Sequence, residues 1–489
     1  MNDVCVESPG AHPRCRSVVM KFGGTSVQDT AAVARLIEVV KARLGRHPVL
    51  VVSALAGVTD QLLHAARAGR QGDQDGALRI LAELRQRHQA VAGGLVADSS
   101  LEELRLALDQ DFDELNDLVR GVAALGEFSP RSQDYVLGFG ECLSSRIVSA
   151  ALVHAGVNAA LVDAHECILT DAAHTQATPL WEETDARLAK VIPPLLQAGK
   201  VPLLGGFIGA TRDGVPTTLG RGGSDFTAAI VGAALHADRI EIWTDVDGIM
   251  TTDPNVCPEA QRIELLSFDE AAELAYFGAK VLHPSTLLPA MRKDIPVHVL
   301  NSGNPACEGT EILSHADSGI RVKAITARRG VAVVDVETRR WAAPEILREI
   351  CEVFERHQHG LDLLSSSRGS LTLLVTSTAG LPAVAEELKG LATVRWENHK
   401  ALVCLVGEQI RRKPEIASQV FGVMSDVDLR MICQGASDRN ISFLVDESQA
   451  DESVRRLHNL FFSRKGIAGS GVAAVAQRSY SLCQAGETW

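Results

Sequence analysis

Residues 18–27 form the stretch that most constrains the fold. A short apolar run leads into Lys21, and two glycines and two hydroxyl residues follow it. In the next segment, residues 33–44, apolar side chains are spaced as on one face of a helix. The pattern predicts a strand, a tight glycine turn and a helix, an arrangement that can hold an anion at the helix N-terminus. A turn with a merely solvated lysine would explain the same residues.

The alternation of strand and helix continues to about residue 301. Helical patterns separate short apolar runs that are expected to form strands, at residues 49–53, 158–162, 201–205, 239–243 and 295–300. Residues 60–125, with a break between Gly69 and Gly76, are expected to form a helical insertion that mainly covers other structure. Alternation of this length predicts an open, mainly parallel α/β sheet with helices on both faces and sites at the carboxyl ends of its strands.

Composition excludes several classes of protein. The chain has 489 residues, a formal net charge of −13 and no basic block, which argues against a nucleic-acid surface. Its ten cysteines are spread singly without a C-x-x-C pair, so we expect reduced thiols in a cytoplasmic protein and neither a disulfide framework nor a metal site. No apolar run is long enough to span a membrane, and the N-terminal residues lack the apolar core of a signal peptide.

The densest chemical stretch is residues 217–227, in which three glycines surround Arg221. The planar guanidinium group of arginine suits a carboxylate or a phosphate, although a structural turn can carry an arginine too. Ser224 or Asp225 is expected to cap the helix that follows. The signatures G-x-x-x-x-G-K-[ST] and G-x-G-x-x-G are both missing, so a phosphotransferase with this sequence is neither a P-loop NTPase nor a protein kinase.

A further candidate binding loop follows the strand expected at residues 239–243. Thr244 and Asp245 begin an Asp-rich, glycine-containing loop of the kind that often faces a nucleotide or its metal, although these residues could simply cap turns. Farther along, Lys280 is the more interesting cation, and His283, which precedes a proline, is expected to be structural.

The chain changes character after a Gly/Pro/Asn-rich junction at residues 302–309. Two strand–helix–strand–strand sets then recur at a spacing of about 70 residues, which predicts a tandem repeat of a small βαββαβ unit. Such units pair edge to edge and bind small ligands between them, or they only make subunit contacts. The expected organisation is a flexible tail at 1–16, a main domain at 17–305, repeat units at 306–398 and 399–465, and a flexible tail at 466–489.

Together these motifs resemble those of the aspartate kinases, most closely the monofunctional, lysine-sensitive bacterial type. The resemblance covers residues 18–462 and rests on KFGGTSV at 21–27, GGFIG at 205–209, TLGRGGSD at 218–225, WTD at 243–245, TTDP at 251–254 and FGAKVLHP at 277–284. The two C-terminal copies resemble ACT domains. The resemblance implies an amino-acid kinase fold followed by two ferredoxin-like regulatory ACT domains. The implied reaction converts ATP and L-aspartate to ADP and 4-phospho-L-aspartate, the first step toward lysine, threonine and methionine or of a derived specialised pathway.

The resemblance also implies roles for individual residues. A carboxylate nucleophile is already ionised at neutral pH, so the reaction needs alignment and charge neutralisation and no general base. The implied catalytic residues are Lys21, Asp225 and Lys280, with Asp225 orienting the lysines. The implied aspartate-binding residues are Ser53, Thr59, Glu141, Arg221 and Ser224. Arg221 would hold the α-carboxylate and Glu141 the ammonium group. The implied ATP-binding residues are Lys21, Gly23, Gly24, Thr25, Thr244, Asp245, Met250, Asn255, Lys280 and Val281, and Mg²⁺ would be carried mainly by the phosphates.

Some positions depart from the family's pattern. Met250 and Asn255 stand where relatives carry a tyrosine and an arginine beside the nucleotide, so we expect stacking and one phosphate contact to be weaker. The expected effector residues are Asp362 and Ser367, but Arg368 replaces the acid that would receive the ammonium group of a lysine effector. We therefore expect inhibition by lysine to be weak or absent.

Two alternatives stay open at this point. One is a catalytically weak protein of the same fold that senses an amino acid. The other is a related kinase that acts on glutamate, acetylglutamate or UMP, although such kinases usually lack the tandem ACT tail. The expected partners are L-aspartate, ATP, an amino-acid effector and further copies of the chain, in a homodimer or a dimer of dimers through the ACT domains.

Overall fold

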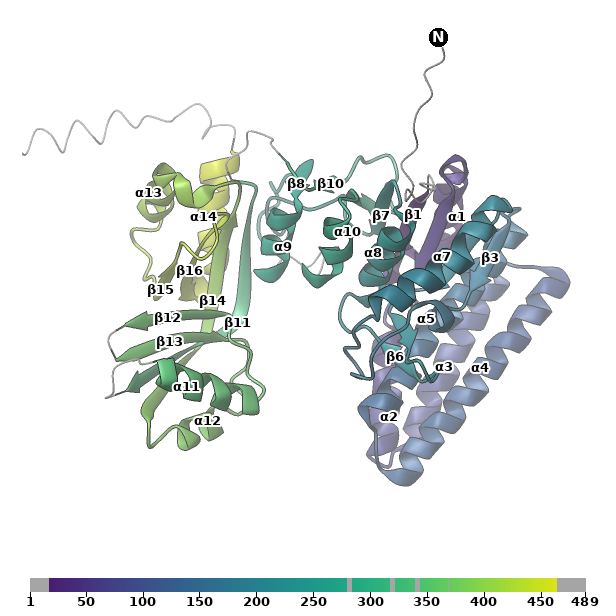
Figure 1. Cartoon of the computed structure of the whole chain (residues 1–489), viewed down its shortest axis with the longest axis horizontal. Helices are drawn as coiled ribbons and strands as arrows, with labels where there is room; N and C mark the ends of the chain where they lie inside the picture. Colours follow the sequence, from purple (N-terminus) through teal and green to yellow (C-terminus); the bar gives the residue numbers. More distant parts are fainter. Residues whose placement is uncertain (1–16, 279–283, 317–321, 339–343, 368, 464–489) are drawn as a thin grey trace, which may run out of the picture. The chain divides into compact units, whose positions relative to one another are not determined.

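The computed structural model describes residues 17–278, 284–316, 322–338, 344–367 and 369–463. The chain divides into two compact units, and each is described by itself (Figure 1). The first unit comprises the chain up to residue 249 together with 262–276 and 280–318, and the second comprises 250–261, 277–279 and the chain from 319 onward. The linear domain boundaries stay predictions, and both predicted tails lie outside the described residues.

The first unit is organised around one eight-stranded sheet. Its strands, in spatial order, are β3 (Ala159–Val162), β4 (Val201–Gly205), β2 (Pro48–Val52), β1 (Val18–Phe22), β7 (Arg239–Thr244), β9 (Val297–Asn301), β10 (Thr310–Leu313) and β8 (Leu265–Ser267). Neighbouring strands run parallel except β9 and β10, which pair antiparallel. The predicted open, mainly parallel sheet is confirmed. Its central strands are near-continuous apolar runs because they are buried on both faces.

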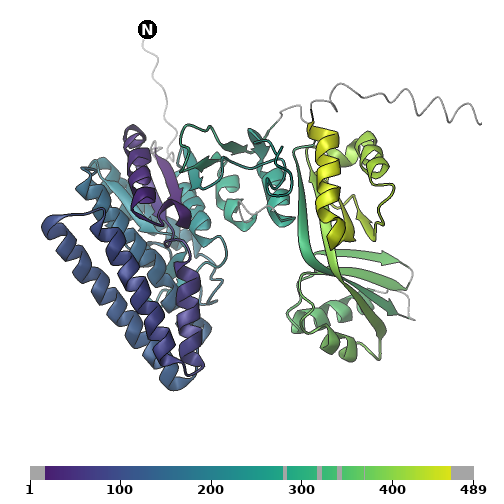
Figure 2. The ribbon, with the colours of Figure 1, turned by 180° about the vertical axis from the view of Figure 1, so that it is seen from behind.

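Helices cover both faces of this sheet. One face carries α1 (Thr30–Lys41) and α5 (Pro130–His154), and the other carries α7 (Trp181–Gln197) and α8 (Gly223–Leu235). Figure 2 shows α1, in purple, on the face that is turned away in Figure 1. Met20 and Phe22 of β1 join the core on the α1 side, whereas Val19 faces α8. Because side chains alternate along a strand, Lys21 is directed to the α8 side with Val19.

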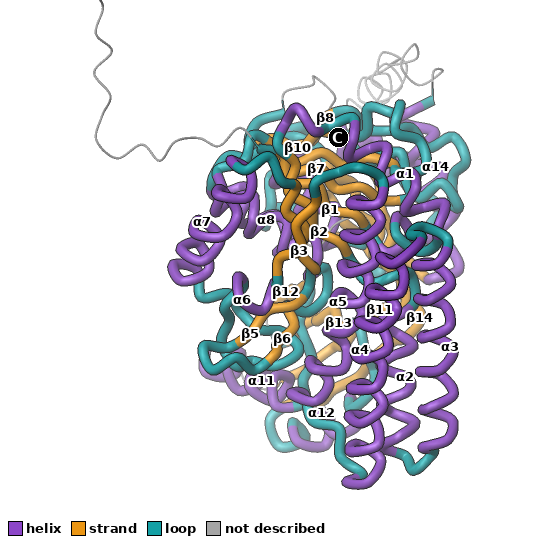
Figure 3. Tube along the Cα trace, turned by 90° about the vertical axis from the view of Figure 1, so that its right-hand side faces the viewer, coloured by secondary structure: helices purple, strands orange, loops and turns teal. Residues whose placement is uncertain are grey.

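The predicted helical insertion lies between β2 and β3. It consists of α2 (Val58–Arg70), α3 (Gln74–Gly93) and α4 (Asp98–Leu125), which lie side by side and pack along α5 (Figure 3). The helical pattern breaks between Arg70 and Gln74, inside the range from Gly69 to Gly76 that the sequence predicted. There the Asp73 carboxylate caps α3 by accepting a hydrogen bond of 2.9 Å from the Gly76 N–H group.

One local prediction about a helix start, that for α8, is wrong. Helix α5 begins at Pro130, where the Ser129 hydroxyl accepts the Ser132 N–H group at 3.1 Å. Helix α8 is preceded by Gly222 with φ of 74°, so neither Ser224 nor Asp225 caps it. Helix α5 is also long and apolar enough to cross a membrane, but 72% of its most apolar window is buried, as in the core helix of a globular unit.

Short elements complete the first unit. They are η1 (Gly24–Ser26), η2 (Leu44–Arg46), α6 (Ala164–Cys167), the β5–β6 hairpin (Ile208–Ala210 and Pro216–Thr218), α9 (Phe268–Tyr276), η3 (Pro284–Leu287) and α10 (Leu288–Arg292).

The second unit contains a six-stranded antiparallel sheet. In spatial order its strands are β12 (Leu363–Ser367), β13 (Ser370–Val375), β11 (Ala324–Thr338), β14 (Ala392–Val406), β16 (Asn440–Asp446) and β15 (Met431–Cys433). Its helical elements are α11 (Pro344–Arg356), α12 (Leu381–Glu387), η4 (Ile410–Arg412), α13 (Pro414–Val423), η5 (Glu447–Gln449) and α14 (Ala450–Phe462).

Two separate apolar cores lie along this sheet. One gathers residues from β11, α11, β13 and α12, and the other gathers residues from β14, α13, β16 and α14. The predicted pair of small repeat units is thus confirmed. The long strands β11 and β14 run through both cores, because Ile325 packs in one core and Val334 in the other, and Ala392 and Val403 are divided in the same way.

Candidate active site

A cavity of about 630 Å³ opens at the carboxyl ends of β1, β2 and β4, where an open α/β sheet usually binds its ligands. Eight residues singled out in the sequence line this one cavity although they come from five separate segments. They are Lys21, Gly24, Ser53, Thr59, Glu141, Arg221, Ser224 and Asp225. The fold therefore brings all the predicted aspartate-binding residues to one place.

Lys21 and Asp225 form an ion pair inside the cavity. Lys21 Nζ lies 2.6 Å from Asp225 Oδ1, and only 11% and 15% of the two side chains are exposed. Asp225 lies in the first turn of α8, where a carboxylate interacts favourably with the helix dipole. The pair holds the lysine ammonium group at the helix N-terminus, in a partly desolvated place where its charge acts strongly on a bound anion.

Glu141 is a buried carboxylate with a spare acceptor. Its side chain comes from the middle of α5, and Oε1 accepts the Ala54 N–H group at 3.1 Å. The other oxygen, Oε2, has no hydrogen-bond partner within the described residues. Burial raises the pKa of Glu141 to about 8, and the Ala54 hydrogen bond and the charge of Lys21 oppose that rise only in part. A carboxylate of this kind favours a cationic partner that enters the cavity.

The loop after β2 approaches the glycine turn after β1 very closely. A Cβ atom on Gly24 would lie 3.0 Å from the Ala54 carbonyl oxygen, so the approach requires glycine. The Ala56 N–H group also donates to the Gly24 carbonyl at 3.2 Å. Arg87 of α3 supports this contact, since its guanidinium group donates to the carbonyls of Ala56 at 2.9 Å and Gln28 at 3.2 Å. The sequence reasoning missed this role of the helical insertion.

Arg221 lies at the tip of a turn between Gly220 and Gly222, which have φ of 76° and 74°. Its side chain is exposed, and no ion pair to it exists within the described residues. Gly206 lets the end of β4 reach the first turn of α8, because a Cβ atom there would lie 2.6 Å from Ser224 Cβ. An unpaired guanidinium group at the mouth of a cavity can receive a carboxylate.

Two helix N-termini also line the cavity. Gly57 and Thr59 belong to the start of α2, and Gly223 and Ser224 belong to the start of α8. The first N–H groups of a helix have no partner within the helix and carry partial positive charge. The cavity thus combines two anion-attracting helix ends and two cations with one buried carboxylate.

Four of the predicted nucleotide residues lie beside this cavity and not in it. The lining, taken over the described residues, includes Gly24 but not Gly23, Thr25, Thr244 or Asp245. The Gly23 N–H group donates to the Trp243 carbonyl at 3.0 Å. This amide holds β7 against the turn, and the role of Gly23 in ATP binding stays a prediction. Thr244 and Asp245 follow Trp243 directly at the carboxyl end of β7.

The other residues predicted to bind ATP are not located relative to this cavity. Lys280 and Val281 lie outside the described residues, as does His283. Met250 and Asn255 belong to the second unit. Their roles stay predictions.

The expected effector residues lie in the second unit. Asp362 directly precedes β12, and its carboxylate pairs with the Arg328 guanidinium group at 3.0 Å. Ser367 is the last residue of β12 and pairs with Ser370 of β13. Arg368 lies outside the described residues.

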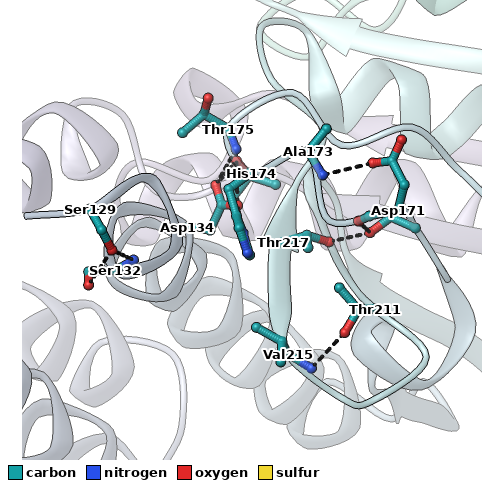
Figure 4. A network of polar contacts seen from close by, with 12 residues as sticks. Ser129, Ser132, Asp134, Asp171, Ala173, His174, Thr175, Thr211, Val215 and Thr217 are labelled. Atoms are coloured by element: carbon teal, nitrogen blue, oxygen red, sulfur yellow. Dashed lines mark hydrogen bonds and ion pairs between the residues drawn. The ribbon is translucent and has the colours of Figure 1, made fainter.

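A buried polar cluster beneath the cavity escaped the sequence reasoning. Asp134 of α5 contacts His174 and Thr175 (Figure 4). It also contacts Thr218, and the two threonines line the cavity. One signal was available, because Asp134 lies seven residues before Glu141 and so on the same face of α5. No local pattern indicated the backbone of Thr175, which has φ of 73°.

The fold and the cavity define an amino-acid kinase that is followed in the sequence by a regulatory domain. Residues 16–301 match the model of the amino acid kinase family, and residues 403–461 match a model of the ACT domain.

Full-length relatives narrow this assignment. The chain is 35% identical to the lysine-sensitive aspartokinase 3 of Escherichia coli over 91% of this chain and 99% of that protein. It is 36% identical to the chloroplastic aspartokinase 3 of Arabidopsis thaliana, over 91% of this chain and 81% of the other. Among solved structures, E. coli aspartokinase III in complex with aspartate and ADP, in its R-state, gives a TM-score of 0.82 at 34% identity over 91% of this chain and all of that one. The T-state structure of that enzyme, with lysine and aspartate, gives 0.76.

The chain belongs to the aspartokinase family. The predicted enzyme class, an aspartate kinase with regulatory ACT domains, is thereby confirmed.

Proposed function

We propose that this protein transfers the terminal phosphoryl group of ATP to the side-chain carboxylate of L-aspartate, in the biosynthesis of amino acids of the aspartate family. One observation carries the assignment to this cavity: a buried carboxylate with a spare oxygen, Glu141, and an unpaired guanidinium group, Arg221, line the same space as the Lys21–Asp225 pair. These groups are complementary to an amino acid that has a second carboxylate.

Aspartate binds through both of its backbone charges. Glu141 Oε2 receives the ammonium group, and Arg221 receives the α-carboxylate in a charge-assisted hydrogen bond. Ser53, Thr59 and Ser224 supply hydrogen bonds around the substrate. The side-chain carboxylate of aspartate is then held at a fixed place near Lys21, as a nucleophile that needs no base.

The phosphoryl group binds at the cationic end of the cavity. Lys21 neutralises the charge that spreads over the transferring group, and Asp225 holds the lysine in position. The Gly24 turn and the N-termini of α2 and α8 add N–H donors. By resemblance, Lys280 meets the nucleotide phosphates, and Thr244 and Asp245 border the nucleotide.

The chemistry of the donors fits a magnesium ion that is bound mainly by ATP. In the part of the chain that the structure describes, no group of three His, Cys, Asp or Glu side chains could hold a metal by itself. Asp245, exposed after β7, is the carboxylate that would meet a phosphate-bound ion. Such an ion would neutralise the phosphate charge when bound.

The alternative of a catalytically weak sensor makes a different prediction. Release of ADP is measured with L-aspartate, with L-glutamate and without an acceptor. A kinase with the proposed substrate releases ADP only with aspartate, and the variants Glu141→Gln and Arg221→Ala raise KM for aspartate while leaving KM for ATP unchanged. Equal rates with glutamate, or binding of aspartate without ADP release, would refute the proposal.

The proposal extends to assembly and location. The chain acts in the cytoplasm as a homodimer or a dimer of dimers through its ACT domains. Support comes from β12 and β15, which are the two edges of the six-stranded sheet and which carry the exposed side chains of Leu364 and Ile432. Light scattering on the purified protein tests it, and a monomer at micromolar concentration would refute it.

A further inference from the structure

Asp134 is the most completely buried carboxylate near the cavity, with 1% of the residue and none of its side chain exposed. It is not among the residues that line the cavity. Its position in the second turn of α5 is fixed, because Ser129 caps that helix and Glu141 continues the same helix face. A carboxylate at such a place must be satisfied by hydrogen bonds from the protein.

Three groups from distant segments supply those hydrogen bonds. The Thr175 N–H group lies 3.0 Å from both oxygens, and His174 Nδ1 lies 2.8 Å from Oδ2 (Figure 4). The Thr218 hydroxyl donates to Oδ1 at 2.5 Å. Thr218 ends β6, and Thr175 lies in the segment between α6 and α7. Asp134 thus joins α5 to two backbone segments: one ends at Thr218, two residues before Gly220, and the other contains Thr175.

Thr175 is held in a conformation that its side chain disfavours. Its φ of 73° lies in the left-handed region, which is an outlier for a β-branched residue. Such strain persists only where the surroundings over-determine it, and here the Asp134 carboxylate receives the Thr175 N–H group with both oxygens.

The strained residue bears directly on the turn that carries Arg221. The Thr175 carbonyl oxygen lies 3.1 Å from the point where a Cβ atom on Gly220 would stand. The Ala177 N–H group also donates to the Thr218 carbonyl at 2.9 Å, which joins the two flanking segments. A shift of Thr175 would therefore move Gly220 and the guanidinium group that follows it.

We propose that Asp134 is a positioning residue for aspartate binding: by holding Thr175 in its left-handed conformation and Thr218 at the end of β6, it fixes the Gly220–Arg221 turn at the place where the substrate α-carboxylate binds. This inference rests on the proposed role of Arg221. Asp134 does not touch the substrate, and it has no part in ATP binding.

The test measures both KM values, kcat and the thermal unfolding midpoint for Asp134→Asn in the full-length protein. Because a hydrogen-bonded charge is lost, we expect KM for aspartate to rise about tenfold or more while KM for ATP stays within about twofold. Glu241→Gln is the matched control. Glu241 is also 1% exposed, bonds to the Trp243 indole and Arg43, and lies away from the cavity, so it should lower the unfolding midpoint without changing KM for aspartate.

A second substitution separates positioning from simple structural support. Glycine adopts a positive φ without strain, so Thr175→Gly no longer needs the clamp. In the double variant Asp134→Asn/Thr175→Gly, KM for aspartate should return to within about threefold of the value for Thr175→Gly alone. If Asp134→Asn fails to fold, His174→Ala removes one partner of the carboxylate at a half-buried site and should raise KM for aspartate by a smaller factor.

Two results would overturn the role of Asp134, and a third would overturn the role of Arg221 on which it rests. A fall in the unfolding midpoint with both KM values unchanged overturns the inference, and so does a rise in KM for aspartate that Thr175→Gly does not reduce. If Arg221→Ala leaves KM for aspartate unchanged, the proposed role of Arg221 fails, and the inference fails with it for a separate and recognisable reason.

Discussion

Aspartate should bind more tightly as the pH rises, because Glu141 must be ionised to receive the ammonium group. Burial raises the pKa of this carboxyl group from 4.5 to about 8, and the Ala54 hydrogen bond and the Lys21 charge only moderate that effect. At pH about 7, roughly one carboxyl group in ten is therefore ionised before the substrate arrives. Each pH unit below the pKa then costs about 1.4 kcal/mol of binding free energy.

Initial rates of ADP release at saturating ATP give KM for aspartate at each pH. We expect KM to fall about eightfold between pH 6.5 and 7.5 and to level off above roughly pH 8.5, where most of the Glu141 carboxyl groups are already ionised before aspartate binds. KM for ATP should not change with pH in this way, because binding of the nucleotide does not depend on the charge of Glu141. Buffers of constant ionic strength keep screening of the surface charges equal across the series.

Glu141→Gln tests the origin of the slope. Glutamine keeps the size and the Ala54 hydrogen bond but carries no charge, so the variant should show a high KM for aspartate that no longer varies over this pH range. Glu241→Gln should keep the wild-type slope, since Glu241 lies outside the cavity lining. A slope that persists in Glu141→Gln, or a flat profile in the wild type, would refute the reasoning.

Three other measurements follow. Lys21→Met should lower kcat by about 10²–10³-fold, the usual loss for one preorganised group, and the exposed Lys41→Met is its control; an unchanged kcat would contradict the role of Lys21. Because the pKa of Glu141 is raised in the folded protein, the unfolded chain releases this proton at a lower pH, and the free energy of unfolding should fall by about 5 kcal/mol at most between roughly pH 4.5 and 8. Urea titrations at each pH should show a smaller fall for Glu141→Gln than for the wild type. Lysine should inhibit weakly or not at all, since Arg368 replaces an acid and Asp362 already pairs with Arg328; strong inhibition at sub-millimolar lysine would sink this expectation.

The features of the fold that depend on the periodicity of apolar residues could be predicted from the sequence. Alternation along β1 directs Lys21 to the α8 side of the sheet, and the strand ends bring Ser53 and Gly206 to the same edge. Most of the side chains that line the cavity could therefore be predicted from short motifs that follow strand ends. Glu141, which comes from the middle of α5, is the exception. The family resemblance supplied their roles.

Local capping rules gave the wrong start for α8. Ser224 and Asp225 are good capping residues, but the left-handed Gly222 precedes the helix and Asp225 pairs with Lys21 from another segment. A long-range ion pair thus outweighed the local preference. Asp134 could not be interpreted for a related reason, since its partners Thr175 and Thr218 lie 41 and 84 residues away along the chain.

The C-terminal repeat shows a different limit of sequence reasoning. A period of about 70 residues predicts two similar units, but it does not determine which strand joins which core. Val322 and Ile325 lie in the first predicted repeat unit, residues 306–398, yet they pack in the core that also contains Phe443 and Leu457, near the C-terminal end of the unit. The first strand of the second unit, β11, therefore packs in the same core as the last helix, α14. Strand β11 takes part in both cores, with Ile325 in one and Val334 in the other, and its pairing with β14 shifts register between Arg328 and Val333. The irregular stretch therefore lies where the strand passes from one core to the other.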